Sequence, residues 1–268
     1  MLQRFLIDFI SKICYNCIGY SLNLTQRRAD KIMINRFSRT EMLLGSDAME
    51  KLRSSHVAVF GIGGVGGHAA EALARCGVGR LTLFDNDTVS LTNINRQAVA
   101  TDRTVGMQKT EVMRSRIHDI NPDAEVTVHN DFYLPENADK YPLGGYTYIV
   151  DAIDTVSAKL ELAVRAERED VPIISCMGTG NKLNPCLLEV SDIYKTSMCP
   201  LARVMRTELR KRGVKALKVV FSTEKALSPR ATEEVTSKRS VPGSVSFVPS
   251  VAGLIIAGEV VKDITGVR

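Results

Sequence analysis

The sequence predicts an α/β protein with a doubly wound, mainly parallel sheet and helices on both faces of the sheet. From Leu52 onward, short apolar segments alternate with segments of helical periodicity, and the connections between them are short. This alternation is typical of a parallel sheet whose connecting helices cover both faces. The chain has 268 residues, of which 44% are hydrophobic and 24% charged, so it can bury the large core that such a sheet requires.

Five short apolar segments before Gly180 are expected to be strands. They are residues 56–60, 80–85, 125–129, 146–151 and 172–176. Three further segments have helical periodicity, and two of them end at the helix stops Gly77 and Asn121-Pro122. These expected helices are residues 67–77, 106–121 and 155–170.

After Gly180 the alternation changes, and a basic C-terminal extension of the sheet domain is expected. A helix with a strongly basic side is predicted at residues 199–214 and a strand at residues 216–222. A polar stretch rich in Ser, Thr and Pro follows at residues 223–244 and is expected to be a mobile loop. The last helix, at about residues 250–265, is expected to return to the core.

The N-terminal segment is expected to lie outside the main domain. Asp8 and Lys12 interrupt its apolar run and no clean small-residue cleavage site follows, which indicates a weak amphipathic helix rather than a signal peptide. Met33 opens a stretch typical of a natural start. We therefore expect a domain over residues 33–268 and an extension over residues 1–32, whose translation and contact with a membrane surface the sequence leaves open.

No segment predicts an integral membrane span. The most apolar stretch, residues 244–261, contains Pro249, Gly253, Gly258 and Glu259 and falls short of the roughly 20 apolar residues of a span. A buried helix or a membrane-surface helix is expected there instead. The six cysteines are irregularly spaced and form no disulfide framework, so a cytoplasmic location is expected, with peripheral membrane association left open.

The net charge of +5 is unevenly distributed along the chain. Residues 195–240 carry 12 Lys and Arg against 4 Asp and Glu, a net charge of +8, whereas residues 37–194 carry 15 against 22, a net charge of −7. A basic segment on an acidic body is typical of a protein with a polyanionic partner such as nucleic acid. A solvated basic face without a partner explains the charge equally well.

A glycine-rich turn follows the first expected strand, with the spacing Gly61-x-Gly63-x-x-Gly66 before a helix. The first glycine of this motif makes the turn, the second lets the backbone approach a phosphate, and the third lets helix and strand pack. Asp85 ends the second expected strand, 22 residues after Gly63, where a carboxylate would meet ribose hydroxyls. The pattern predicts a Rossmann-like nucleotide-binding fold without distinguishing NAD from ATP.

The residues after the second expected strand favour a triphosphate over a nicotinamide. The loop at residues 84–97 gathers five polar side chains at the strand's carboxyl end, where ligands bind in such folds. These five are Asp85, Asp87, Asn93, Arg96 and Gln97. An arginine forms bidentate bonds to phosphoryl oxygens, and Lys109 can reach a phosphate from the next helix as a point charge. A hydride-transfer site has little need of these groups.

Two carboxylates, Asp151 and Asp154, stand at the end of the fourth expected strand. Mg²⁺ prefers one or two carboxylates together with phosphate oxygens and water, so this edge suits a magnesium ion. Taken singly, each polar residue at these strand ends is more often part of a surface ion pair. As a set at consecutive strand ends, they predict a site for ATP and Mg²⁺.

These motifs resemble the ThiF/MoeB family, bacterial relatives of ubiquitin-activating enzymes that adenylate carboxylates. The resemblance rests on the glycine turn, on "LFDNDTVSLTNINRQ", on Lys109 and on "DAIDT", and it extends from about Asn35 to the C-terminus. It implies that four glycines line the ATP phosphates, namely Gly61, Gly63, Gly64 and Gly66.

The resemblance also implies roles for the polar residues of the predicted site. Asp85 would hold the ribose with Asp87 beside it, and Asp154, followed by Thr155, would bind magnesium. Four residues would grip the triphosphate, namely Asn93, Arg96, Gln97 and Lys109. In "NRFSRTEMLLG", Arg39 corresponds to the family's arginine that reaches the phosphates of the partner subunit, which implies a homodimer. The expected catalytic residues are Arg39, Arg96, Lys109 and Asp154.

The cysteines argue against a structural zinc site. Sulfur-carrier activators of the family typically carry zinc on two C-x-x-C pairs, but this chain has one such pair, Cys14 and Cys17, in the N-terminal extension. Tetrahedral zinc needs four ligands, so no structural zinc is expected. Cys176 and Cys186 lie in apolar sequence and are expected in the core, whereas Cys199 is a weak candidate for a thioester nucleophile.

The segment "DIYKTSMCPLARVMRTELRKRGV" resembles the tRNA-modifying branch of the family, which cyclises threonylcarbamoyladenosine next to the anticodon. The resemblance implies that ATP adenylates the threonine carboxylate, after which the carbamoyl nitrogen attacks and expels AMP. Such an intramolecular closure needs no covalent cysteine. Residues 195–240 would then face tRNA carrying threonylcarbamoyladenosine.

Sulfur-relay proteins are a further partner that the resemblance allows. Two alternative functions stay open. One is an adenylating enzyme for a sulfur-carrier protein that ends in Gly-Gly. The other, from a different class, is an NAD(P)-dependent oxidoreductase, which would leave Arg96, Lys109 and Asp154 unexplained.

Overall fold

The computed structural model describes residues 34–230 and 242–267. The predicted extension at residues 1–32, the start at Met33 and part of the predicted loop at residues 223–244 therefore lie outside the described residues. The chain divides into two compact units, residues 1–38 and 39–268. In the described end of the first unit, the Asn35 side chain accepts a hydrogen bond from the backbone N–H of Phe37 at 2.7 Å. The sheet and the helices around it belong to the second unit.

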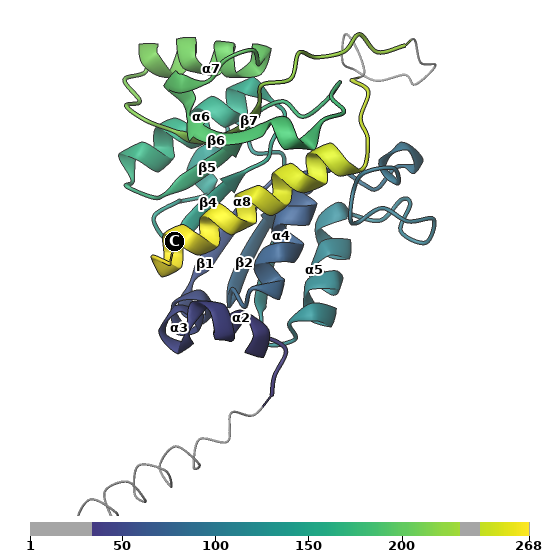
Figure 1. The fold of residues 1–268 in the computed structure, drawn as a ribbon, viewed down its shortest axis with the longest axis vertical. Helices are drawn as coiled ribbons and strands as arrows, with labels where there is room; N and C mark the ends of the chain where they lie inside the picture. The colour runs from purple at the N-terminus through teal and green to yellow at the C-terminus, as the bar shows by residue number, and fades with distance from the viewer. Residues whose placement is uncertain (1–33, 231–241, 268) are drawn as a thin grey trace, which may run out of the picture. The chain divides into compact units, whose positions relative to one another are not determined.

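A seven-stranded sheet forms the centre of the second unit, with the strand order β3-β2-β1-β4-β5-β7-β6 (Figure 1). Every neighbouring pair is parallel except the last, in which β6 runs antiparallel to β7. The predicted doubly wound, mainly parallel α/β fold is therefore confirmed. The strands are β1 (His56–Phe60), β2 (Arg80–Phe84), β3 (Glu125–His129), β4 (Tyr148–Asp151), β5 (Ile173–Cys176), β6 (Leu188–Asp192) and β7 (Lys218–Ser222).

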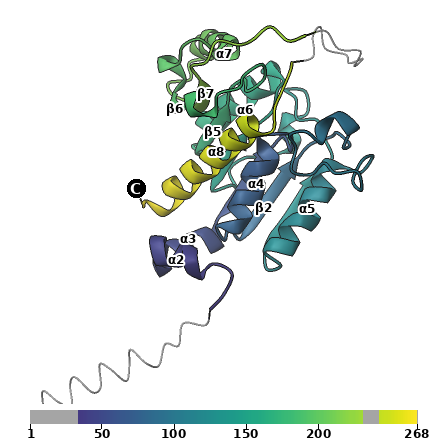
Figure 2. The same ribbon diagram turned by 45° about the vertical axis from the view of Figure 1, so that its right-hand side comes forward.

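Helices cover both faces of this sheet. On one face α4 packs against α5 and α8, and on the other α6 packs against α7 (Figures 1 and 2). Two short helices, α2 and α3, precede β1. The helices are α2 (Ser38–Leu44), α3 (Ser46–Ser54), α4 (Gly66–Arg75), α5 (Lys109–Ile120), α6 (Val156–Arg168), α7 (Pro200–Lys211) and α8 (Phe247–Thr265). Single turns of 3-10 helix are η1 (Leu91–Asn93), η2 (Ala138–Lys140), η3 (Pro185–Leu187) and η4 (Ile193–Lys195).

The register of the first two strands places the glycine turn beside the predicted ribose-binding residue. Phe60 and Phe84 are the last residues of β1 and β2 and are paired in register. Their rings stack with centroids 4.2 Å apart in the core beneath α6. Since parallel strands end at the same edge, Gly61 and Asp85 leave the sheet next to each other.

Helix α8 differs from the expected last helix because it begins earlier. Pro249 falls in its first turn, where proline removes no intrahelical hydrogen bond and is tolerated. One side of α8, with Val248, Ile256 and Val260, is buried, whereas Phe247 and Leu254 are exposed. No helix of the described residues is both long and apolar enough to cross a bilayer. The stretch at residues 244–261 is therefore a core helix in this fold.

Gly253 sets the distance between α8 and α4. A Cβ atom at this position would lie 2.4 Å from the carbonyl oxygen of Val65 and 3.0 Å from the Cβ of His68. Val65 is the last residue before α4 begins, directly after the glycine turn. The bare backbone of Gly253 therefore lets α8 press against the end of that turn.

We expect Gly253→Ala to lower the free energy of unfolding by about 1–3 kcal/mol, because overpacking forces the two helices apart. Gly258→Ala is the matched control in the same helix, since a Cβ there meets nothing within 4 Å. That control should gain up to about 1 kcal/mol from the better helix propensity of alanine. Denaturant unfolding measures both, and equal effects of the two substitutions would contradict the close contact.

Candidate active site

The glycine turn after β1 is built by close backbone contacts. Gly61 has a φ of +89°, and a Cβ there would lie 2.7 Å from the carbonyl oxygen of Ala152 in the turn after β4. A Cβ at Gly66 would lie 1.8 Å from the carbonyl oxygen of Gly61. Both positions therefore require glycine for the packing of strand, turn and helix, as the motif predicts.

Gly63 differs from these two because its surroundings leave room, whereas Gly64 is close to its neighbours. The nearest atom to a Cβ at Gly63 would be Nε2 of Gln97, at 3.9 Å. A Cβ at Gly64 would meet side-chain carbons of Pro249 and Arg96 at 3.2 Å and beyond. No side chain caps the first turn of α4, which starts here. The open side of Gly63 and the uncapped N–H groups of α4 form a surface on which an anion can bind.

Asp85 connects the end of β2 to this turn. Its carboxylate accepts hydrogen bonds from the backbone N–H of Ile62 at 2.7 Å and of Asp87 at 2.9 Å. Burial raises the pKa of the Asp85 carboxyl, against the opposing attraction of Lys109. The carboxylate therefore holds the glycine turn in place from the neighbouring strand.

Lys109, the first residue of α5, supplies a cation at the same edge. Only 5% of the residue is exposed, and its ammonium group donates to Asp87 at 2.7 Å and lies 3.9 Å from Asp85. Of these two carboxylates, that of Asp87 is the exposed one. The buried Asp85 and the exposed Asp87 therefore hold the ammonium group of Lys109 at the carboxyl edge of the sheet.

The loop around η1 carries three of the four predicted triphosphate residues, Asn93, Arg96 and Gln97. Asn93 is buried, and its Oδ1 accepts from the backbone N–H of Ser90, so its side chain shapes the loop. Arg96 is half-buried and donates to the carbonyl oxygen of Thr92 at 2.9 Å.

Gln97 is the exception in this loop because its hydrogen bonding is incomplete. The side chain is buried, and within residues 34–230 and 242–267 its Oε1 has no hydrogen-bond partner. Its Nε2 is the atom that faces the open side of Gly63. A buried polar atom without a partner is costly, so this amide beside the glycine turn is suited to a bound ligand.

The two carboxylates after β4 have different environments. Asp154 is exposed, and the hydroxyl of Thr155 lies 3.5 Å from its carboxylate. Asp151 is fully buried, and Lys159 on α6 pairs with it at 2.8 Å. The sequence interpretation that both acids suit a metal is therefore wrong for Asp151, because Lys159 neutralises it.

A metal at this edge would rely on few protein ligands. In the described part of the chain, no three His, Cys, Asp or Glu side chains come together as a metal-binding group. The donor set still fits Mg²⁺, which is usually held by one or two carboxylates plus phosphate oxygens and water. Asp154 is the exposed carboxylate on the β4 side of the glycine turn.

Arg39 does not lie with the other predicted residues. It is exposed on α2, which Gly45 alone separates from α3. The end of α3 lies at the amino end of the sheet, where the carbonyl oxygen of Ser55 accepts from the backbone N–H of Arg80 at 3.1 Å. Figure 1 accordingly shows α2 and α3 at the end where β1 begins, opposite to the glycine turn. Since a five-residue strand spans roughly 16 Å, Arg39 lies away from the glycine turn.

Burial argues against two of the described cysteines, Cys176 and Cys199, as nucleophiles. Cys176 is buried at the end of β5, and burial raises the pKa of its thiol to about 12. Cys199 is also buried, directly before α7. Cys186 is exposed, so its expected place in the core is wrong. It falls in the 3-10 turn η3, directly before β6, and its apolar neighbours gave no sign of this exposure. Cys14 and Cys17 lie outside the described residues.

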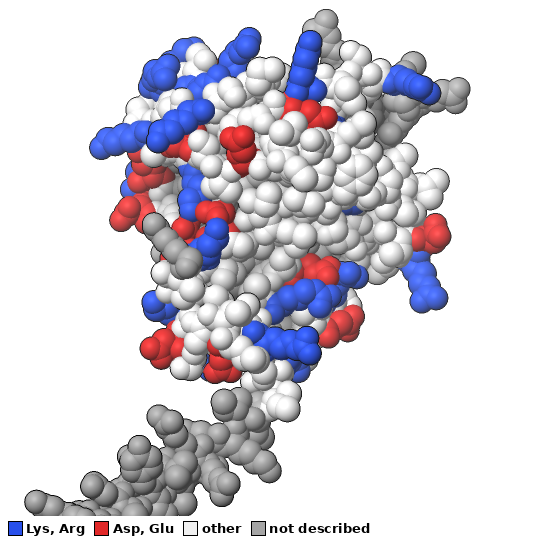
Figure 3. All heavy atoms as spheres, viewed as in Figure 1, with Lys and Arg blue, Asp and Glu red and all other residues white. Residues whose placement is uncertain are grey.

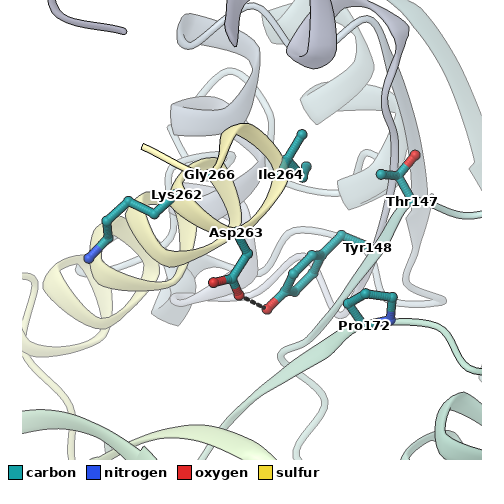
Figure 4. Close-up of a pocket in the computed structure, with 7 residues that line it drawn as sticks. All are labelled: Thr147, Tyr148, Pro172, Lys262, Asp263, Ile264 and Gly266. Carbon is teal, nitrogen blue, oxygen red and sulfur yellow. Dashed lines mark hydrogen bonds between the residues drawn. The ribbon is translucent and has the colours of Figure 1, made fainter. Parts of the chain in front are cut away.

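A pocket of about 510 Å³ lies at the other end of β4, away from the glycine turn (Figure 4). Tyr148 and Asp263 face each other in it, and the tyrosine hydroxyl donates to the carboxylate at 2.7 Å. Lys218 also pairs with Asp263, at 2.7 Å. Tyr148 and Asp263 therefore already have hydrogen-bond or ionic partners, and none of the predicted site residues lines this pocket.

Sequence reasoning missed Lys159, the buried partner of Asp151. Its signal was a charged residue between Ala158 and Leu162, on the face of α6 that packs into the core. Such a lysine needs a buried acid, and the end of the preceding strand supplies one.

The geometry thus defines a doubly wound α/β domain with a glycine-rich turn and flanking charged residues at one sheet edge. The model of the ThiF family matches residues 37–268. The chain is 43% identical over 242 residues to tRNA threonylcarbamoyladenosine dehydratase of Bacillus subtilis (strain 168), which covers 87% of this chain and 95% of the relative. The chain belongs to the ThiF family.

Solved structures and a second class of relatives add to this comparison. The crystal structure of Escherichia coli tRNA N6-threonylcarbamoyladenosine dehydratase, TcdA, in complex with ATP has a TM-score of 0.79 to this fold at 37% identity, covering 86% of this chain and 94% of that one. The molybdopterin-synthase adenylyltransferase of Escherichia coli (strain K12) is 37% identical over 143 residues, which cover 52% of this chain and 57% of the relative.

Alkylation of the native protein tests the placement of the cysteines. We expect iodoacetamide to modify Cys186 rapidly and to leave Cys176 and Cys199 unmodified, because reaction requires an accessible thiolate. Peptide mass spectrometry reads out each site, and protein unfolded in guanidinium serves as the control in which all three react. If Cys199 in the native protein were alkylated as fast as Cys186, it would be accessible and would again be a candidate nucleophile.

Proposed function

We propose that this chain is an ATP-dependent tRNA threonylcarbamoyladenosine dehydratase. The observation that carries the proposal is the extent of its similarity to proteins of that name, which spans 87% of the chain and 95% of the Bacillus subtilis relative. The similarity to a molybdopterin-synthase adenylyltransferase covers only 52% of the chain. Activation of a Gly-Gly-ending sulfur carrier is therefore the less supported alternative. The two dehydratase structures with AMP and ATP leave an NAD(P)-dependent oxidoreductase without support.

The residues at the carboxyl edge suit ATP as a substrate. The open side of Gly63 and the N–H groups at the start of α4 would receive phosphate oxygens, since a helix N-terminus attracts anions. Asp85 lies where a carboxylate meets the ribose. Arg96 and the Nε2 amide group of Gln97, which faces Gly63, would supply donors to phosphate oxygens.

Lys109 would serve as the mobile positive charge of this site. Its ammonium group bonds to the exposed Asp87 without a ligand, and a phosphate group can compete for that bond. Asp154, with Thr155 beside it, would hold Mg²⁺ on the β4 side. The metal would neutralise phosphate charge as a carboxylate approaches.

The proposed reaction has two steps at this edge. The threonine carboxylate of the modified adenosine attacks the α-phosphorus of ATP, which gives an acyl-adenylate and releases pyrophosphate. The carbamoyl nitrogen then attacks the activated carbonyl carbon, loses its proton and expels AMP, which closes a hydantoin-type ring. Arg96 and Lys109 would stabilise the phosphoryl charge in the first step. The second step is intramolecular, so proximity supplies much of its rate.

The basic segment would bind the tRNA. Helix α7 buries Ala202, Met205 and Leu209 and exposes arginines on its other side, including Arg203 and Arg210. Figure 3 shows basic side chains gathered over the end of the molecule where α7 lies. Contacts of such a face with phosphates would make tRNA affinity fall steeply with salt.

We also propose a homodimer, a cytoplasmic location and an Arg39 that acts across the subunit interface. The distance of α2 from the glycine turn of its own subunit supports the role of Arg39, because an arginine at that end is free to meet a second copy. Met42 and Leu43 on the same helix are both 84% exposed, which suits a helix that a partner covers. The ring closure as written requires no sulfur, so a sulfur-relay partner is no part of this proposal.

The decisive assay supplies the purified protein with ATP, Mg²⁺ and tRNA that carries threonylcarbamoyladenosine. We expect the modified nucleoside to lose the mass of one water, as measured by mass spectrometry of digested tRNA, with one AMP and one pyrophosphate released per event. Omission of ATP is the control. An unchanged nucleoside, with pyrophosphate exchange only in the presence of a Gly-Gly-ending carrier protein, would favour the alternative.

Mixed dimers test whether Arg39 acts in trans. Arg39→Ala and Asp154→Ala should each be inactive as homodimers, whereas a mixture allowed to exchange subunits should recover part of the activity. A mixed dimer keeps one site with both residues intact. A mixture of Arg96→Ala with Asp154→Ala is the control and should stay inactive, because both residues belong to the same subunit's site. No recovery in the first mixture, with subunit exchange verified, would place Arg39 in its own subunit's site.

A further inference from the structure

A buried ionic network lies directly beneath the turn that carries Asp154. The carboxylate of Asp151 and the ammonium group of Lys159 lie 2.8 Å apart, and both side chains are completely buried. Ser175 on β5 is the register partner of Asp151 and donates its hydroxyl hydrogen to the same carboxylate. The network thus connects β4, β5 and α6 at the carboxyl edge of the sheet.

Both ends of this ion pair bind the same residue of the turn, Ile153. The backbone N–H of Ile153 donates to Oδ1 of Asp151 at 3.2 Å. Its carbonyl oxygen accepts from Nζ of Lys159 at 3.1 Å. That carbonyl belongs to the peptide group that leads into Asp154. The two charges therefore fix the direction in which the chain enters the proposed metal-binding residue.

The same turn supports the glycine turn from below. The backbone N–H of Ala152 donates to the carbonyl oxygen of Phe60 at 2.8 Å, and the carbonyl oxygen of Ala152 faces Gly61. A shift of residues 152–154 would thus move Asp154 and the backbone beneath the phosphates together.

Stability alone gives a weak reason for such a network. Taking two charges out of water is expensive, and replacing a buried ion pair by apolar residues of similar size is often neutral or stabilising. Groups that orient a metal ligand, in contrast, can set metal affinity and activity by about 10- to 100-fold.

We propose that Asp151 and Lys159 are positioning residues, which hold the turn at residues 152–154 so that Asp154 meets the magnesium ion of bound ATP. This inference rests on the proposed function. It assigns the pair no contact with ATP. The pair therefore affects only the gain in ATP affinity that Mg²⁺ provides.

The test compares ATP affinity in Mg²⁺ with ATP affinity in EDTA, measured by calorimetry on the full chain. We use the neutral pair Asp151→Asn/Lys159→Met, which leaves no unpaired buried charge and should keep its melting temperature within a few degrees. The gain in affinity from Mg²⁺ should fall about tenfold or more in this variant, as in Asp154→Asn. Adding Asp154→Asn to the neutral pair should cause no further loss, because both act on one interaction.

Tyr148→Phe is the matched control, because it removes a hydrogen bond at the other end of the same strand and should leave the Mg²⁺ effect unchanged. Ser175→Ala keeps the ion pair and removes one hydrogen bond to it, so it decides the question if the neutral pair does not fold. It should reduce the Mg²⁺ effect about fivefold.

Three results would overturn the inference. The first is an intact Mg²⁺ effect in the folded neutral pair, or in Ser175→Ala where that pair does not fold. The second is a further loss of the Mg²⁺ effect when Asp154→Asn is added to the neutral pair, so that the two losses multiply. The third is a wild-type affinity for ATP that does not depend on Mg²⁺. Failure of the wild-type chain to bind ATP at all would instead overturn the proposed function, and the inference with it.

Discussion

The close approach of the glycine turn to the turn after β4 is the constraint on which the site depends. Gly61 adopts a positive φ so that its backbone can lie against the carbonyl oxygen of Ala152, and Gly66 starts α4 against the carbonyl oxygen of Gly61. A side chain at either position would separate β1 from β4 at their carboxyl ends. Without this contact, the N-terminus of α4 could not face the same space as Asp154.

Four charged groups at this edge of the sheet differ in how freely they can change partners. Asp151 and Lys159 satisfy each other in the core and bind the backbone of Ile153. Lys109 is buried but pairs with the exposed Asp87, so its partner can change when a ligand arrives. Asp154 is exposed. The buried pair Asp151–Lys159 can hold the turn at residues 152–154 in place, while the exposed Asp154 stays accessible to ligands that bind and leave.

The sequence predicted the parallel part of this fold well, because each strand there is a short apolar run next to an amphipathic helix. Strand β3 has the predicted bounds, residues 125–129. Strand β6 was missed, since Leu188 and Val190 are its apolar residues and it lies at the sheet edge. The alternation of strands and helices in the sequence does not indicate an edge strand that pairs in antiparallel orientation.

The sequence predicted which residues stand at the candidate site better than it predicted their surroundings. The spacing of Gly61, Gly63 and Gly66 predicted a turn that the structure contains, and close backbone contacts restrict two of these positions, Gly61 and Gly66, to glycine. The environment of Asp151 was not predictable in the same way, because its partner Lys159 comes from the next helix. Nor could the sequence indicate that Cys186 is exposed, since apolar neighbours do not report the path of a loop.

The central claim is that ATP at this edge activates the carboxylate of a modified adenosine. The most direct measurement uses tRNA whose threonylcarbamoyladenosine carries ¹⁸O in both threonine carboxylate oxygens, followed by mass spectrometry of the released nucleotide. Attack of the carboxylate on the α-phosphorus transfers one of these oxygens to AMP when the ring closes. The account therefore predicts AMP with a single ¹⁸O atom. Release of ADP, or of AMP without the label while the ring still forms, would contradict it.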